Sequence, residues 1–262
     1  MTGFETDERG VAYVRGFLKL DPKKQTELLR YYFDFLGHED TRIAEDAYME
    51  WYRAPAAARF EAARTLPAAK VWKLVRDSKE DSSRQTFFAS LLASCGKPGD
   101  AEELFKLSEA SKNPYGFYFS ILSLNAKEYA PRIRALAKDK TKFLPRFYVF
   151  QAASKLYEVN TTAFPREKCV EIMADFLEQG DMADFPIEFF RKWKRWEFTE
   201  TILKLHERKS HKVVIVRNAI LRYALQAPGE KAAAYVAKMR KEDPELVRYL
   251  EEESLEEEKA AK

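Results

Sequence analysis

The segment FFRKWKRWEF, residues 189–198, carries the side chains that come closest to a recognisable binding chemistry. Cations alternate in it with aromatic rings, and two of the rings are tryptophans. Cations bind phosphate groups and an aromatic face stacks on an unpaired base, so this composition is typical of nucleic-acid grooves. The six residues at its centre form the main candidate binding site: Arg191, Lys192, Trp193, Lys194, Arg195 and Trp196.

Two local structures fit this segment. On one continuous helix, Phe189, Trp193 and Trp196 would share an apolar face, and the cations would occupy the rest of the surface. Alternatively, one helix ends near Trp193 and the next begins near Trp196, with Lys194 and Arg195 at the corner. Both arrangements bury the rings and expose the cations. Packing therefore explains the segment as well as a binding groove does.

A second basic cluster lies in KDKTKFLPRF, residues 138–147, which we expect to be a loop followed by the start of a helix. A run of charges is usually a solvated turn, so this cluster becomes a candidate site only if it lies beside the first one. Its basic residues are Lys138, Lys140, Lys142 and Arg146.

Histidines are too few and too scattered for a metal centre. His38 and His206 each precede a glutamate, and His211 stands alone. An iron or zinc site needs a full set of histidine and carboxylate ligands that converge on one point. We therefore expect exposed histidines near helix ends, with no metal and no cofactor.

The two cysteines, Cys95 and Cys169, form neither a CxxC pair nor a disulfide framework. We expect buried, reduced thiols, and the pattern leaves one disulfide between them open. A nucleophilic cysteine needs a neighbouring base and a lowered pKa, and the sequence places no base beside either thiol. The sequence therefore predicts no catalytic residue, and a protein that is more typical of a binding module than of an enzyme.

Composition indicates a folded helical protein. Of the 262 residues, 46% are hydrophobic and 33% are charged, and 45 basic residues nearly balance 42 acidic ones. The net charge of +3 does not by itself indicate a nucleic-acid or membrane partner. Only 9 glycines occur, while helix-forming residues dominate, and no apolar stretch is long enough to span a membrane. We expect an all-α protein.

Helix start and stop signals follow one another with short connections, which makes successive helices antiparallel neighbours. Asp-Pro and Asn-Pro pairs at Asp21, Asn113 and Asp243 are typical helix starts. The expected helices cover residues 7–18, 22–36, 41–53, 55–64, 67–76, 82–95, 99–110, 114–126, 128–138, 143–157, 165–178, 183–193, 197–207, 212–226, 230–241 and 244–257.

Weak internal repeats suggest that these helices stack as hairpins. Arg42, Arg84, Arg146 and Arg217 each follow a polar turn and precede an apolar, alanine-containing helix. Units of roughly 30–40 residues with two helices are typical of α-solenoids. The sequence predicts one solenoid domain over residues 1–262 as a right-handed superhelix. We expect its acidic end to fray from about residue 251, because adjacent glutamates repel.

The turn-arginine-helix units resemble HEAT repeats. In more detail, LLRYYFDFLGHEDTRIAEDAYMEWYRAP, CGKPGDAEEL, RKWKRWEFT and VIVRNAILRYALQ resemble a group of HEAT-like proteins from planctomycete bacteria, over nearly the whole chain from about Val11 to Val247. The resemblance implies the α-solenoid fold and carries no activity. Members of that group often have an extra amino-terminal region with an export signal. The chain as written predicts a cytoplasmic protein, and such a region would make it an exported one.

Two functions follow as expectations. Stacked helical hairpins form an extended concave surface without any catalytic group, which favours a non-enzymatic scaffold for an unknown protein or peptide partner. The alternative is a nucleic-acid-binding protein, or a glycosylase similar to the HEAT-like DNA-alkylation-repair enzymes, that uses Trp193 and Trp196. A purely structural module is a third expectation.

Overall fold

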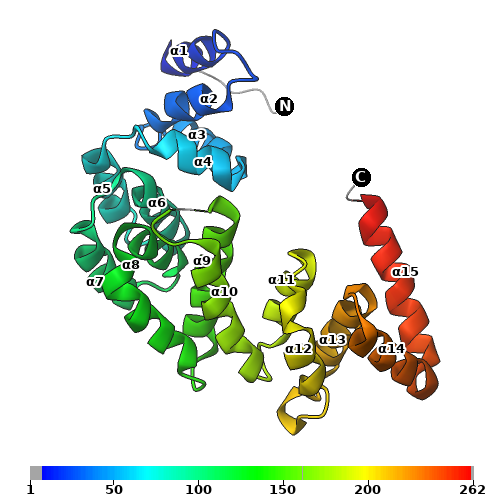
Figure 1. Cartoon of the computed structure of the whole chain (residues 1–262). Coiled ribbons are helices and arrows are strands. Elements are labelled where there is room, and N and C mark those ends of the chain that lie inside the picture. Colours follow the sequence, from blue (N-terminus) through cyan, green and yellow to red (C-terminus); the bar gives the residue numbers. More distant parts are fainter. Residues whose placement is uncertain (1–7, 161, 261–262) are drawn as a thin grey trace. The chain divides into compact units, whose positions relative to one another are not determined.

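The computed structural model describes residues 8–160 and 162–260, and over these residues the protein is helical and contains no strand (Figure 1). This confirms the all-α class. The chain divides into two compact units, Met1–Val170 and Glu171–Lys262. The single domain expected over residues 1–262 stays a prediction. In the described part of the chain, no helix is both long and apolar enough to cross a membrane.

In the first unit the even-numbered helices form a row. Helix α2 packs on α4, α4 on α6 and α6 on α8, while α5 pairs with α6 and α7 pairs with α8. Helix α9 packs on α8 and also contacts α4. The bounds are α1 Glu8–Phe17, α2 Gln25–Phe33, α3 Thr41–Arg53, α4 Ala56–Ala63, α5 Ala68–Asp77, α6 Ser82–Cys95, α7 Asp100–Ala110, α8 Tyr115–Lys138 and α9 Phe143–Val159.

In the second unit, α11 packs on α13 and α13 on α15, and α14 contacts α12, α13 and α15. Leu221, Val236, Met239, Val247 and Leu250 form part of the core between these helices. Helix α10 (Arg166–Ala174) contains the boundary between the units. It is followed by η1 Asp175–Glu178, α11 Asp184–Lys192, η2 Trp196–Phe198, α12 Thr199–Leu205, η3 Lys209–His211, α13 Val214–Gln226, α14 Glu230–Glu242 and α15 Pro244–Ala260.

Aspartate caps fix several helix starts. Asp40 accepts a hydrogen bond from the Arg42 N–H, and Asp81 accepts from the N–H groups of Ser83 and Arg84, so α3 and α6 begin where the sequence predicts. Helix α2 begins later than predicted. The Asp21 carboxylate accepts from the Lys23 N–H at 2.9 Å and closes a turn first.

Two predicted helices form one kinked element. Helix α8 bends at Asn125, whose φ of −148° and ψ of 61° are not helical. The kink lies two residues before the predicted break at residue 127, inside the predicted helix 114–126. Pro131 lies six residues after the kink, inside the second helical segment.

A close crossing between α6 and α8 requires glycine at position 116. The Gly116 N–H donates to the Thr86 Oγ1 at 2.8 Å. A Cβ at this position would lie 1.8 Å from the Thr86 carbonyl oxygen. Around the crossing, Phe88, Leu92, Phe117 and Ile121 are buried, and they form the core of the first unit.

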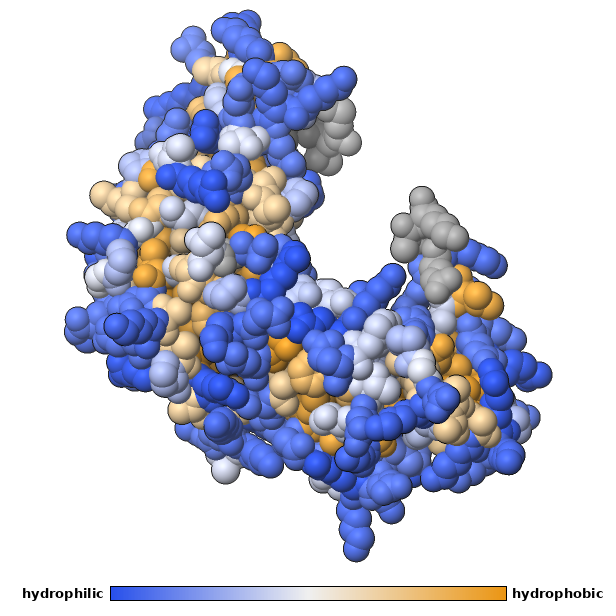
Figure 2. Space-filling model, viewed as in Figure 1, coloured by the Kyte–Doolittle hydropathy of each residue, from blue (hydrophilic) through white to orange (hydrophobic). Residues whose placement is uncertain are grey.

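Polar residues cover most of the face shown in Figure 2, and apolar residues gather there in smaller patches. One run of consecutive apolar side chains is exposed at the start of α13. Its members, Val213, Val214 and Ile215, are 53%, 71% and 56% exposed.

Candidate functional site

The Arg191–Trp196 segment forms a corner between two helices. Helix α11 ends at Lys192, Trp193 caps it, and η2 begins at Trp196. Lys194 turns the chain in the left-handed backbone region, with a φ of 55°. This geometry confirms the two-helix arrangement, with Lys194 and Arg195 at the corner.

Both tryptophans pack on rings of their own unit. Trp193 meets Phe189 edge to face, with ring centroids 4.8 Å apart. Trp196 meets Tyr223 in the same way at 5.2 Å, and the Tyr223 hydroxyl donates to the Arg195 carbonyl oxygen at 2.8 Å. Both tryptophan rings are half-buried, and the contact of Trp196 with Tyr223 holds the corner against α13.

Arg191 is buried, contrary to the exposure expected from the sequence. Its side chain is 4% exposed and its Nη2 lies 2.8 Å from Glu188 and 2.9 Å from Glu257. Arg195 is mostly buried as well and pairs with Glu197 at 2.6 Å. Within the described residues, the exposed cations of this segment without an ion pair are therefore Lys192 and Lys194.

The acidic end of α15 explains why Arg191 is buried. Arg222 of α13 bridges Glu188 and Glu253, each at 3.0 Å, beside the Arg191 pairs. Helix α15 extends to Ala260, and the fraying that repulsion between its glutamates predicts from about residue 251 stays a prediction. The arginines of α11 and α13 neutralise part of that repulsion, so the acidic run packs onto its own unit.

The second basic cluster lies in the first unit, whereas the corner lies in the second. Lys138, Lys140 and Lys142 are exposed around the turn between α8 and α9. Arg146 is 1% exposed, contrary to the solvated turn expected for it. Its Nε donates to the Lys142 carbonyl oxygen at 3.0 Å, and its guanidinium lies 5.9 Å from the Phe143 ring centroid. The arginine thus closes the first turn of α9.

The histidines have structural partners. His211 is fully buried, contrary to the expected exposure, and its Nε2 donates to the Leu177 carbonyl oxygen at 2.8 Å. His206 Nδ1 lies 2.9 Å from the Tyr235 hydroxyl, and burial, followed by Arg217, lowers the pKa of this histidine. Residues 8–160 and 162–260 hold no group of three or more histidine, cysteine or acidic side chains that could bind a metal.

The two cysteines are free thiols. Burial raises the pKa of Cys95 to about 11 and that of Cys169 to about 12. Both thiols are therefore protonated at neutral pH, which is the opposite of what a nucleophile needs.

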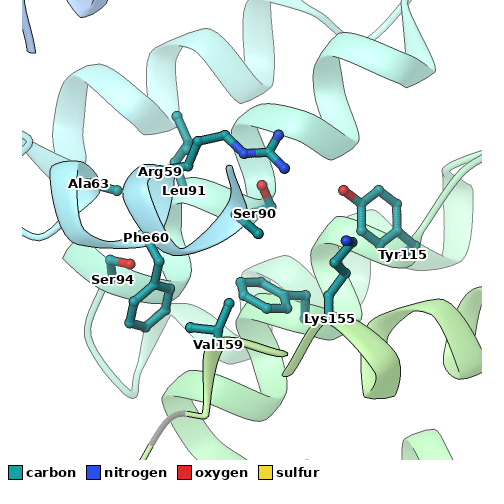
Figure 3. Close-up of a pocket in the computed structure, with 11 residues that line it drawn as sticks. Arg59, Phe60, Ala63, Ser90, Leu91, Ser94, Tyr115, Lys155 and Val159 are labelled. Atoms are coloured by element: carbon teal, nitrogen blue, oxygen red, sulfur yellow. The ribbon is translucent and has the colours of Figure 1, made fainter. Parts of the chain in front are cut away.

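A pocket that the sequence did not indicate lies between α4, α6, α8 and α9 (Figure 3). Its volume is about 30 Å³, enough for a carboxylate-sized group or two waters. Figure 3 shows the Arg59 guanidinium, the Ser90 and Tyr115 hydroxyls and the Lys155 ammonium directed toward a common space. Phe60 and Phe119, with centroids 6.3 Å apart, form part of its apolar wall.

Two hydroxyls of this pocket have no hydrogen-bond partner within the described chain, whereas the Ser90 Oγ donates to the Phe87 carbonyl oxygen at 2.6 Å. Arg59 forms no ion pair with a described residue, but its guanidinium lies over the Phe87 ring, 5.8 Å from the centroid. The Tyr115 hydroxyl makes no hydrogen bond in the same part of the chain, and the buried Ser94 Oγ has none either. Lys155 pairs with the exposed Glu158 at 2.7 Å. Arg59, Tyr115 and Lys155 are half-buried and therefore open to an incoming acceptor, and Ser94 Oγ is the buried atom of this lining that has no partner within the described chain.

The electrostatics of the pocket are positive. Burial raises the pKa of the Tyr115 phenol, while the nearby Arg59 charge opposes that rise. The sequence could not predict this pocket, because Arg59, Tyr115 and Lys155 come from three helices and match no motif. Only the contacts of α4 with α6 and α9 bring them together.

Comparisons of the chain with protein-family models, with curated proteins and with solved structures gave no match.

Proposed function

We propose that the protein is a non-enzymatic scaffold that binds another protein or a peptide, and that the Arg59 pocket receives a carboxylate of this partner. The scaffold is a right-handed α-solenoid of degenerate HEAT-like hairpins in this proposal. The row α2, α4, α6 and α8 supports it, because second-neighbour packing is what stacked hairpins produce. Arg84 of α6 also pairs with Glu45 of α3, as a ladder between neighbouring repeats requires.

The unpartnered donors of the pocket are the observation that carries the proposal. A carboxylate would accept hydrogen bonds from the Arg59 guanidinium and the Tyr115 hydroxyl, and charge-assisted bonds of this kind are the strong ones. Lys155 would exchange its exposed partner Glu158 for the ligand. The adjoining phenylalanine rings would hold an apolar neighbour of the acidic group.

The test selects displayed random twelve-residue peptides on the full chain, and then measures the affinity of the enriched peptides by fluorescence anisotropy. We expect enriched peptides to bind the Arg59→Gln variant at least about tenfold more weakly, because a charge-assisted hydrogen bond is lost. Arg30→Gln, which removes an exposed charge on α2, is the matched control and should bind as the wild type does.

Peptides made as free acids, as C-terminal amides, and with glutamine or asparagine in place of acids identify the source of the carboxylate. Absence of any enriched peptide would contradict the proposal. Equal binding to the Arg59→Gln variant and the wild type would also contradict it, at the level of the pocket.

Nucleic-acid binding at the corner is the second candidate, because Lys192 and Lys194 are exposed beside the half-buried Trp193. Under this alternative, the double variant Lys192→Glu, Lys194→Glu would weaken binding of duplex DNA. The slope of the logarithm of the affinity against the logarithm of the salt concentration would become less steep, by an amount that corresponds to about two released counterions. Equal anisotropy titrations for the variant and the wild type would exclude this corner as the DNA-binding surface.

A further inference from the structure

A larger cavity lies between α1, α2 and α3, and its chemistry is the opposite of that of the Arg59 pocket. Its volume is about 370 Å³, within the range of small-molecule sites. Aromatic and aliphatic side chains of α1 and α2 form one wall, and α3 supplies acidic side chains.

Three aromatic rings line this cavity. Tyr13 and Tyr32 are 7% and 6% exposed, and Phe17 is half-buried. The Tyr32 ring centroid lies 6.2 Å from that of Phe17, with the rings stacked at 30°, and 6.2 Å from that of Tyr13 at 56°. The electron-rich faces of such rings attract cations.

The acidic side chains lie one helical turn apart on α3. Asp46 accepts a hydrogen bond from the Tyr13 hydroxyl at 2.6 Å and has no cationic partner among the described residues. Glu50 lies 3.8 Å from the exposed Arg53. The remaining charged pair of the lining, Asp40 and Arg42, is joined at 2.8 Å and neutralises itself. Among the described lining residues, three carboxylates therefore stand against one arginine.

The Tyr32 hydroxyl is a second, independent polar feature of the cavity wall. The residue is more than nine-tenths buried, it lines the cavity, and its hydroxyl makes no hydrogen bond within the described chain. Burial first, and then the Glu50 and Asp46 carboxylates, raise the pKa of this phenol to about 12. The phenol thus experiences the negative field of the same two acids that line the cavity.

We propose that this cavity binds an ammonium group, either a lysine side chain of a peptide or a quaternary ammonium compound. The rings of Tyr13, Phe17 and Tyr32 form the wall on one side of the cation, and Asp46 and Glu50 supply the countercharge. The Tyr32 hydroxyl accepts a hydrogen bond from a primary ammonium. A quaternary ammonium instead relies on the ring faces.

The experiment measures the binding of four probes to the full chain by ligand-observed NMR and calorimetry. Choline is compared with 3,3-dimethylbutan-1-ol, which has nearly the same shape and no charge. Acetyl-lysine methylamide is compared with its trimethylated form. We expect both kinds of cation to bind and the neutral alcohol to bind about fivefold to thirtyfold more weakly than choline.

Substitutions then locate the site. Glu50→Gln and Asp46→Asn should each weaken choline binding at least about threefold, because each removes a countercharge. Asp46→Asn also keeps an oxygen for the Tyr13 hydroxyl. Glu80→Gln removes an exposed charge outside the cavity and should bind as the wild type does. Thermal unfolding midpoints equal to that of the wild type show that the variants are folded.

The two lysine probes distinguish the sources. Tighter binding of the trimethylated probe identifies a quaternary ammonium site, and tighter binding of the unmodified probe identifies a lysine site held by hydrogen bonds. Equal affinity of choline and the neutral alcohol, no effect of Glu50→Gln and Asp46→Asn, or no binding of any cation at millimolar concentration would each overturn the proposal.

Discussion

Lys194 occupies a backbone position that favours glycine. Its φ of 55° places the backbone in the left-handed region, which costs about 1–2 kcal/mol for a residue with a Cβ. We expect Lys194→Gly to raise the free energy of unfolding by about 0.5 kcal/mol, after the extra entropy of glycine in the unfolded chain is counted. Urea unfolding followed by tryptophan fluorescence checks this.

The matched control for Lys194→Gly is Lys192→Gly, the same exchange at the last residue of α11. There the backbone is helical, and glycine should destabilise by about 0.5–1 kcal/mol. The two substitutions are therefore predicted to have opposite signs, and a loss of stability in both would show that the corner is not strained.

Among the cations of the Arg191–Trp196 segment, Arg191 should contribute most to the stability of the second unit. Loss of its charge leaves Glu257 without this partner and weakens the neutralisation of Glu188. We expect Arg191→Gln to lower the free energy of unfolding by about 3 kcal/mol, as is typical when one partner of a buried pair is removed. The adjacent exposed residue provides the control, since Lys192→Gln should change it by less than about 0.5 kcal/mol. Equal effects would mean that Arg191 is solvated.

At the scale of elements, the α6–α8 crossing depends on one missing side chain. A Cβ at Gly116 would overlap the Thr86 carbonyl oxygen, which is backbone and cannot rotate away. We expect Gly116→Ala to cost about 2–4 kcal/mol, because α8 must shift away from α6. Thermal unfolding measures the cost.

Gly99 offers a control for this prediction. A Cβ there would meet no atom within 4 Å, so Gly99→Ala should cost only the difference between glycine and alanine at the N-cap of α7, about 0.5–1 kcal/mol. If Gly116→Ala were equally mild, the two helices could separate freely at this point.

The sequence predicted the elements well wherever a local signal sets their ends. Helices α3 and α6 coincide with the predicted ranges, because Asp40 and Asp81 cap them within the same few residues. The kink of α8 also lies two residues from a predicted break between two helices. The start of α2 was predicted too early, since a side chain that caps a helix can equally close the turn before it.

The sites were less predictable, because their geometry depends on partners far away in the chain. Arg191 was expected at the surface, and only the packing of α15 brings Glu257 to it. The Arg59 pocket needs α4, α8 and α9 to meet, and no spacing within any one helix indicates that meeting. A local pattern can therefore predict which residues form a helix and miss which charges the fold buries.

At the scale of the whole molecule, both units bury phenols. Burial raises the pKa of Tyr118 in the first unit and of Tyr223 and Tyr235 in the second to about 12. Burial also raises the pKa values of the thiols of Cys95 and Cys169 in the first unit. Each of these groups is neutral when folded and ionises more readily when unfolded.

This asymmetry predicts how stability depends on pH. A group whose pKa is raised in the folded protein stabilises the fold fully at any pH below its pKa in the unfolded chain, which is near 9 for a thiol and 10 for a phenol. This stabilisation is lost as the pH rises through the pKa in the folded protein. The free energy of unfolding should therefore change little between pH 7 and 9 and fall between about pH 9 and 12. Between its two pKa values, each fully buried group contributes a loss of about 1.4 kcal/mol per pH unit.

Urea unfolding at a series of pH values between 8 and 12 measures this loss, and one substitution assigns part of it. Tyr118→Phe removes a buried phenol, so its stability should fall less steeply than that of the wild type above pH 10. Tyr249→Phe removes an exposed phenol and should follow the wild-type curve. A wild-type free energy that is constant up to pH 12 would contradict the burial of these phenols and thiols. A Tyr118→Phe curve parallel to the wild-type curve would show that the Tyr118 phenol ionises alike in the folded and unfolded chain.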